Sequence, residues 1–306
     1  MSQLRFNELR GEEVVYAVDR QERTFLPARD HCPLCPTLPG GPTTEIPLPA
    51  FEIVVFDNRF PAFEAPAGAA EVVVYTDQHD ASFAALGSQR ARDLMSVWLH
   101  RYRELSRRDD VEYVYIFENR GVEVGVTLHH PHGQIYGYPF LPPVAKLELA
   151  ADARLGGCAP CAGIERELAD GERVLIDDGQ VLAYVPFAAR WPYEVHVALR
   201  AHRASLLDCR PEELGSLGDA LQRVVRGYDA LFARPFPYVM AVHQAPTTEA
   251  QPPGAGHLHI EFYPPLRTAD KLKFLAGSEQ GAGTFISDVL PEEAAAGLRE
   301  GLARAA

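Results

Sequence analysis

The residues with the clearest chemical potential stand in one short stretch, His129-His130-Pro131-His132-Gly133-Gln134-Ile135-Tyr136. Alternate residues of an extended strand face the same side, and Pro131 favours an extended backbone at His130. We therefore expect His130, His132 and Gln134 to share one side. An imidazole nitrogen can attack phosphorus or bind a metal at neutral pH, so two histidines at this spacing can divide these roles. The alternative is a solvated strand whose polar side chains face water.

A pair of cysteines with metal-binding spacing lies upstream of this stretch. Cys32 and Cys35 form a C-x-x-C pair, and His79 and His130 would complete a Cys2His2 set, which is typical of tetrahedral zinc. The alternative is two buried free thiols and two unrelated histidines. A zinc ion here would fasten the cysteine segment to the histidine strand and so fix the backbone that carries His132.

The second half of the sequence repeats these residues in the same order. Each distinctive residue of the first half returns 123 to 127 positions later, as Cys158, Cys161, His202, His257 and His259. We infer two copies of one unit, residues 1–145 and 146–306, joined near 142–157. The first four of these residues are a second candidate zinc site, which two zinc ions per chain would support. Cys209 has no counterpart, and we expect it to be a core thiol.

Length and composition limit the class of protein. With 306 residues, 47% of them hydrophobic, the chain can bury a sizeable core. A net charge of −13 argues against a general nucleic-acid binder, which needs a basic surface. No segment is apolar and long enough to span a bilayer, and the first twenty residues lack the apolar core of a secretion signal. We expect a cytoplasmic protein with no membrane partner, in which C-x-x-C pairs favour metal over disulfide.

The apolar and turn-forming residues predict the same order of elements in each half. The first half predicts strands at 51–56 and 71–75, an amphipathic helix at 86–105, a strand at 111–117, a turn at 118–121 and the histidine strand. The second predicts strands at 181–185 and 194–199, a helix from Pro211, a strand at 238–242 and a Pro/Gly-rich loop before His257. Residues 1–30 look like an arm or loop, and proline and glycine make 36–50 irregular. Short connections favour antiparallel pairing, so we predict an α+β fold with antiparallel sheets and packed helices.

The motif Phe117-Glu118-Asn119-Arg120-Gly121, followed by His-His-Pro-His-Gly-Gln, resembles the galactose-1-phosphate uridylyltransferase family of the histidine-triad superfamily. The resemblance extends to 55–58, 236–238 and 262–265, and it implies two tandem histidine-triad-like units. It also implies that His132 takes a uridylyl group from UDP-glucose and passes it to galactose 1-phosphate. Gln134 stands where histidine-triad hydrolases carry a third histidine. An amide binds phosphoryl oxygens but cannot relay a proton to water, which favours transfer over hydrolysis.

The resemblance also implies further site residues. It places the family's zinc on Cys32, Cys35, His79 and His130, in agreement with the spacing. It implies a uridine and phosphate pocket at Asn58, Phe117, Asn119, Gly125 and Thr127, although Phe117 and Gly125 suit ordinary packing equally well. It implies an alternative second metal, iron or zinc, at Glu148, His243, His259 and Glu261.

This sequence departs from the family pattern at several of these positions. Glu261 replaces a histidine of the alternative second metal site. The segment implied to contact the hexose phosphate keeps Lys273 and Glu279, but has Ser278 in place of an aromatic residue. Both charged residues also suit a solvated surface. The family habit is a homodimer whose sites can borrow residues from both chains.

Two other functions fit parts of the sequence. A sugar-nucleotide phosphorylase or adenylyltransferase would use the same His132 with a different base or acceptor. A zinc-stapled binding module without catalysis would also explain two C-x-x-C pairs. The formation of a covalent nucleotide on His132 separates both enzymes from the binding module.

Overall fold

The computed structural model describes residues 2–248 and 254–306, so part of the Pro/Gly-rich loop before His257 lies outside the described residues. The strands are β1 Gln3–Asn7, β2 Glu12–Tyr16, β3 Val54–Asp57, β4 Ala69–Val74, β5 Tyr113–Arg120, β6 His132–Tyr138, β7 Val174–Asp177, β8 Val181–Tyr184, β9 Val195–Leu199, β10 Tyr238–His243 and β11 His259–Tyr263. The α-helices are α1 Ser88–Leu105, α2 Pro143–Leu155, α3 Ala159–Asp170, α4 Pro211–Leu231 and α5 Pro291–Ala305.

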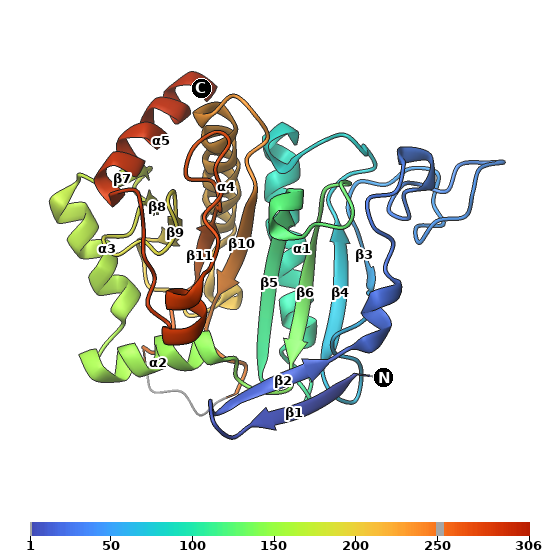
Figure 1. Cartoon of the computed structure of the whole chain (residues 1–306), viewed down its shortest axis with the longest axis horizontal. Coiled ribbons are helices and arrows are strands. Elements are labelled where there is room, and N and C mark those ends of the chain that lie inside the picture. Colours follow the sequence, from blue (N-terminus) through green and yellow to red (C-terminus); the bar gives the residue numbers. More distant parts are fainter. Residues whose placement is uncertain (1, 249–253) are drawn as a thin grey trace.

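Within the described part of the chain, β3 to β11 form one antiparallel sheet (Figure 1). Its order is β3-β4-β6-β5-β10-β11-β9-β8-β7. The first half contributes β3-β4-β6-β5, and the second half contributes the equivalent strands in mirrored order, with β7 added at the edge. The halves meet where β5 pairs with β10, with Phe117 opposite Ala241. The predicted α+β fold with antiparallel strands and repeated halves is confirmed, and the two predicted sheets form a single one.

Helices α1 and α4 cover one face of this sheet, behind the strands in Figure 1. Their buried side chains follow the helical period that predicted them, with Leu94, Trp98 and Tyr102 on α1 and Leu217 and Leu221 on α4. Burying each such side chain contributes roughly 1.5–3 kcal/mol. The helices therefore bury one face of the sheet in a continuous core and leave its other face uncovered by them.

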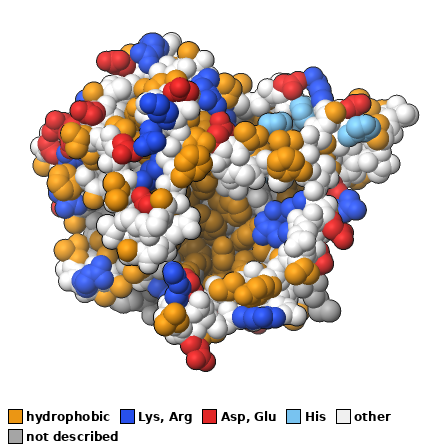
Figure 2. All heavy atoms as spheres, in the orientation of Figure 1, with side chains coloured by type: hydrophobic (Ala, Val, Ile, Leu, Met, Phe, Trp, Pro, Cys, Tyr) orange, Lys and Arg blue, Asp and Glu red, His pale blue; other side chains and the backbone are white. Residues whose placement is uncertain are grey.

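The opposite face carries aromatic side chains at its centre. The Tyr115 and Phe117 rings of β5 lie 5.2 Å apart, and the Phe117 and Tyr136 rings meet edge to face at 4.9 Å. Figure 2 views this face and shows a hollow between the two halves whose floor is hydrophobic. The hairpin β1–β2 and helix α2 lie along its lower side in Figure 1.

Two sequence-based expectations were wrong in detail. Residues 1–30 were expected to be irregular, yet β1 and β2 pair there, with Phe6 opposite Glu13. The turn predicted at 118–121 begins only at Gly121, because β5 continues to Arg120 along β10. The predicted junction near 142–157 contains helix α2, which was not expected from the sequence. Each element lacks a strong apolar period, so tertiary contacts decide its structure.

The extension of β5 carries Glu118 into the core side of the sheet. Its side chain is only 4% exposed, Tyr238 Oη donates to its Oε1 at 3.1 Å, and its Oε2 has no hydrogen-bond partner. Burial raises the pKa of Glu118 to about 7, against the opposing effect of Arg120. The protonated carboxyl is therefore the form that the folded protein favours.

Glu118→Gln should remove a pH dependence of stability. A pKa raised above its unfolded value stabilises the protein fully below about pH 4.5, and this contribution is lost as the pH rises through about 7. The wild-type protein should therefore lose roughly 3 kcal/mol relative to the variant between pH 4.5 and 8. Denaturant unfolding across this range measures the difference. The exposed Glu112→Gln is the matched control, and parallel curves for Glu118→Gln and wild type would contradict the assignment.

Candidate active site and metal centres

His132 opens strand β6 on the hollowed face of the sheet. Its Nδ1 lies 2.7 Å from the carbonyl oxygen of His130, so Nδ1 carries the hydrogen of the neutral ring and Nε2 keeps a lone pair. Burial lowers the pKa of His132 by more than this hydrogen bond raises it. The ring is therefore neutral at physiological pH, which is the form that a nucleophile needs.

Gln134 follows His132 on the same face, and both side chains line one cavity. The Oε1 of Gln134 accepts hydrogen bonds from Asn58 Nδ2 and Tyr136 Oη, each at 3.2 Å. Because the amide oxygen is occupied, its nitrogen remains as a donor for an anionic group. The predicted shared side holds for these two residues but fails for His130, which precedes the strand and turns its ring toward the cysteines.

Gly133 lies between these two side chains and faces the core. A Cβ here would lie 2.2 Å from Tyr75 Oη and 3.0 Å from the carbonyl oxygen of Phe117. Gly133→Ala should therefore lower the free energy of unfolding by about 1–3 kcal/mol, as overpacked cores do. Tyr75→Phe removes the nearest atom, so the double variant should recover part of the loss. Additive effects of the two changes in urea unfolding would contradict this packing argument.

The cavity beside His132 and Gln134 has a volume of about 120 Å³. Asn58 and Thr127, both predicted site residues, line it, and so does Arg23. Burial lowers the pKa of Arg23 from its ordinary value, yet a guanidinium remains charged. Sequence reasoning missed Arg23, because a lone arginine in an irregular segment has no pattern. The cavity thus combines a neutral imidazole, an amide donor and a cation, which together suit an anionic phosphate ester.

The remaining predicted pocket residues are distributed around this cavity. Asn119 lines a larger cavity of about 750 Å³ that also contains His132. Gly125 adopts a left-handed conformation with φ 80° in the loop before Thr127. Phe117 belongs to the aromatic floor. Lys273 and Glu279 pair with each other at 3.1 Å, and neither lines either of the two cavities that contain His132.

The structure brings the four predicted ligands of the first zinc site together. Cys35 Sγ lies 3.4 Å from His79 Nδ1 and 3.6 Å from His130 Nδ1. Zinc bonds of about 2.3 Å to sulfur and 2.0 Å to nitrogen at the tetrahedral angle place these atoms roughly 3.5 Å apart. Burial and Cys32 raise the pKa of Cys35 to about 11, so a bound cation is needed to stabilise its thiolate. The geometry fits a tetrahedral metal site.

The fixed orientation of His130 connects this site to His132. His130 Nε2 donates to the carbonyl oxygen of Thr76 at 2.7 Å, which leaves Nδ1 for the metal. The carbonyl oxygen of the same residue accepts the hydrogen bond from His132 Nδ1. The backbone carbonyl that orients the His132 ring thus belongs to a residue of the candidate metal site.

The second Cys2His2 set has the same geometry. Cys161 Sγ lies 3.2 Å from His257 Nδ1 and 3.5 Å from His202 Nδ1, and Cys158 Sγ lies 3.5 Å from His257 Nδ1. His257 Nε2 donates to the carbonyl oxygen of Leu199, as His130 does to that of Thr76. The predicted repeat therefore extends to the atoms that would bind the metal.

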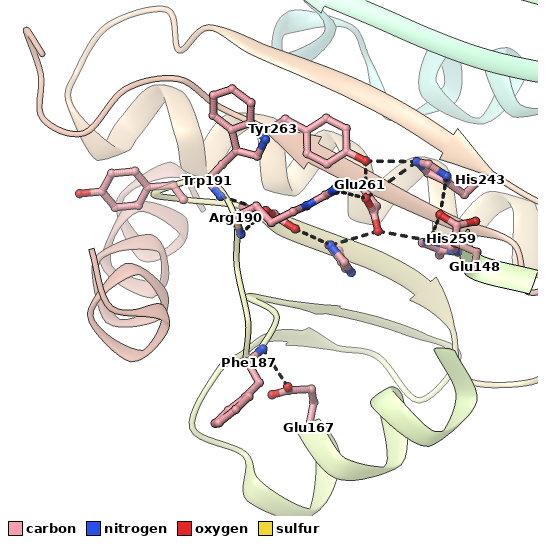
Figure 3. A network of polar contacts seen from close by, with 12 residues as sticks. Glu148, Glu167, Phe187, Arg190, Trp191, His243, His259, Glu261 and Tyr263 are labelled. Carbon is pink, nitrogen blue, oxygen red and sulfur yellow. Dashed lines mark hydrogen bonds and ion pairs between the residues drawn. The ribbon is translucent and has the colours of Figure 1, made fainter. Parts of the chain in front are cut away.

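The alternative second metal residues also converge, next to the second cysteine set. His243 Nδ1 lies 2.9 Å from Glu148 Oε1, and His259 Nε2 lies 3.3 Å from Glu261 Oε1 (Figure 3). Burial alone would lower the pKa of His243 and His259. The neighbouring carboxylates of Glu148 and Glu261 outweigh this effect and raise the pKa of both histidines. Burial would raise the pKa of Glu261, but the histidines hold it well below its ordinary value. The cluster is therefore built to hold positive charge between carboxylates.

Comparison with known proteins agrees with this geometry. The model for the N-terminal domain of galactose-1-phosphate uridyl transferase matches residues 62–142, and the model for its C-terminal domain matches 152–305. The curated galactose-1-phosphate uridylyltransferase of Thermotoga maritima is 39% identical, with 98% of each chain covered. This chain belongs to the galactose-1-phosphate uridylyltransferase family. The predicted boundary at 145/146 lies between the two matched regions, within α2.

Other members of the galactose-1-phosphate uridylyltransferase family are similar over nearly the whole chain. The Streptomyces lividans enzyme of that name is 39% identical over 98% of this chain and 87% of its own. A solved structure described as uridylyltransferase superposes with a TM-score of 0.86 at 31% identity, covering 99% of both chains. The family resemblance read from the histidine motif is confirmed.

Proposed function

We propose that this protein transfers a uridylyl group between UDP-glucose and galactose 1-phosphate through a covalent intermediate on His132. Family membership supports the reaction class, because the curated relatives are galactose-1-phosphate uridylyltransferases. The observation that carries the proposal is the neutral His132 ring, fixed through Nδ1 beside a cavity with an amide donor and a cation. These are the groups that phosphoryl transfer without hydrolysis needs.

The reaction proceeds in two displacements at one phosphorus. The lone pair of His132 Nε2 attacks the α-phosphorus of UDP-glucose, and the phosphorus–oxygen bond to glucose 1-phosphate breaks. A phosphate oxygen of galactose 1-phosphate then attacks the same phosphorus, and the phosphorus–nitrogen bond breaks to release UDP-galactose. The hydrogen bond from His132 Nδ1 to His130 stabilises positive charge on the ring in the intermediate.

The residues around His132 position and stabilise the phosphate. The amide nitrogen of Gln134 donates to a phosphoryl oxygen, and Arg23 offsets the negative charge. Because the amide of Gln134 cannot relay a proton, as a histidine in its place could, water is a poor acceptor for the intermediate. Asn58, Phe117, Asn119, Gly125 and Thr127 form the pocket for uridine and its phosphates.

Zinc is the metal that we propose for the Cys2His2 sites. Cys32, Cys35, His79 and His130 would hold one ion, which would fix the segment that leads into β6 and so orient His132. Cys158, Cys161, His202 and His257 would hold a second. The donor set at Glu148, His243, His259 and Glu261 contains only nitrogen and oxygen, which suits zinc or iron equally.

We also propose that the protein is cytoplasmic and forms a homodimer. Each chain would consist of two units that meet near residue 145. No helix in the described ranges is long and apolar enough to cross a membrane. Free cysteines in C-x-x-C pairs fit a reducing compartment. The family resemblance would place Lys273 and Glu279 at the sugar phosphate of the partner's site, whereas within this chain they pair with each other and line neither His132 cavity.

Incubation of the protein with UDP-glucose and a panel of sugar 1-phosphates tests the proposal. We expect exchange into UDP-galactose with galactose 1-phosphate, together with a uridylyl adduct in intact-mass analysis. Activity only with inorganic phosphate or ADP-sugars would instead establish the phosphorylase or adenylyltransferase alternative. A chain that forms no adduct with either nucleotide would be a zinc-stapled binding module.

A further inference from the structure

Three carboxylates and three histidines converge on the hollowed face of the second half. We call this set the His3Glu3 cluster; its members are Glu148, Glu194, His196, His243, His259 and Glu261. Strand register brings four of them together, because His243 pairs with His259 and Glu261 pairs with His196. Glu148 reaches the same place from α2, and Glu194 directly precedes β9. The described residues form two candidate metal triads here, one around His243 and His259 and one around His196.

Two of the three carboxylates, Glu194 and Glu261, have one oxygen anchored by outer donors and the other directed into the cluster. Glu194 Oε2 accepts from the backbone amides of Arg190 and Trp191 at 2.7 and 3.0 Å, which leaves Oε1 toward His196. Glu261 Oε2 accepts from Tyr263 Oη and from Arg190 Nη2 (Figure 3). Carboxylates that bind metals typically have one oxygen held by outer hydrogen-bond donors and the other free to contact the metal.

The inward oxygen of Glu261 lies between two imidazole nitrogens. Its Oε1 is 3.2 Å from His196 Nε2 and 3.3 Å from His259 Nε2. His196 Nε2 also lies 2.9 Å from Glu194 Oε1, so one nitrogen with at most one hydrogen faces two carboxylate oxygens. A proton on His196 can satisfy only one of them, so when His196 donates to Glu194, Glu261 Oε1 depends on a proton on His259 Nε2. A divalent cation would satisfy all three atoms, because ligands about 2.1 Å from a metal at right angles are roughly 3.0 Å apart.

A second close contact lies in the neighbouring triad. His243 Nδ1 is fully buried and forms an ion pair with Glu148 Oε1 at 2.9 Å, outside good hydrogen-bond geometry. This separation also suits two neighbouring ligands of one cation. His259 Nδ1 is held by the carbonyl oxygen of His257 at 2.7 Å, which directs Nε2 into the cluster.

We propose that Glu194, His196 and Glu261 bind a divalent cation next to the one held by Glu148, His243 and His259. Glu261 Oε1 bridges the two ions, which gives a carboxylate-bridged dinuclear centre. Nitrogen and oxygen donors without sulfur select a first-row divalent metal such as Mn²⁺, Fe²⁺ or Zn²⁺. The centre would hold α2, β9, β10 and β11 together, and none of its residues lines a cavity that contains His132.

Loading the full-length protein with Mn²⁺ tests this centre directly. Bound Mn²⁺ is counted by equilibrium dialysis, and electron paramagnetic resonance distinguishes isolated from exchange-coupled ions. We expect the wild-type protein to bind two Mn²⁺ ions per chain with a coupled signal. His196→Leu should bind one, with the six-line signal of an isolated ion. Glu194→Gln, which keeps the side-chain shape, should weaken the second ion by at least about 10-fold.

His100→Leu on the exposed side of α1 is the matched control and should behave as wild type. One Mn²⁺ or none in a folded wild-type protein, or an uncoupled signal with two bound, would overturn the dinuclear centre. Circular dichroism checks that His196→Leu is folded. If this variant does not fold, the loss of the second Mn²⁺ ion is tested with Glu194→Gln instead. The uridylyl adduct on His132 is measured on the same samples, so failure of the proposed function is seen separately.

Discussion

His132→Asn should fold normally but form no uridylyl adduct with UDP-glucose, and sugar exchange should fall by at least about 10⁴-fold. Asparagine retains a donor near the carbonyl oxygen of His130, so the loop keeps its structure. It lacks the lone pair that attacks phosphorus. Intact-mass analysis measures the adduct, and coupled detection of UDP-galactose measures exchange.

The matched control for this change is His100→Asn, because His100 is exposed on α1. It should form the adduct at the wild-type rate. An adduct that persists in His132→Asn would show that another residue is the nucleophile. The candidates would then be the other histidines that line the cavities, His79, His129 and His130.

Cys35→Ser should remove one zinc ion per chain and lower activity strongly. Loss of an outer partner of a zinc ligand alone costs about 10–100-fold in metal affinity, so loss of a ligand should cost more than about 100-fold. Without the ion, His130 is released from Cys35, and the carbonyl oxygen that orients His132 is no longer fixed. Elemental analysis measures the zinc, and thermal unfolding and sugar exchange measure its consequences.

Two other cysteines serve as controls. Cys209→Ser changes a thiol that belongs to neither cluster, and it should keep all zinc and full exchange. Cys158→Ser should lose a zinc ion yet keep the uridylyl adduct, because its cluster lies beside His259 rather than His132. Full activity of a zinc-depleted Cys35→Ser protein would contradict the coupling of this site to the nucleophile.

Much of this site follows from residue spacing alone. The two C-x-x-C pairs and their histidines recur in one register, and a duplicated fold brings both sets to equivalent places. Site residues that belong to no repeated motif could not be predicted in this way. Arg23 comes from a segment without periodicity, and His196 looks like any residue of a half-buried strand until Glu261 is seen opposite it. Helix α2 was missed because its apolar residues follow no strong period, although it supplies Glu148.

His132 and His259, the first residues of equivalent strands, are held in the same orientation, and this bears on how many nucleotides each chain can bind covalently. His259 is held by His257 as His132 is held by His130, yet the residue two positions on is Glu261 instead of Gln134. The amide of a glutamine can donate a hydrogen bond to the anionic oxygens of a nucleotide, whereas the carboxylate of a glutamate repels them. The second copy is therefore electrostatically closed to nucleotides, and each chain should carry a single covalent UMP at saturation. In the two proposals above, the first copy of the unit therefore carries the reactive histidine, and the second copy carries carboxylates that bind cations.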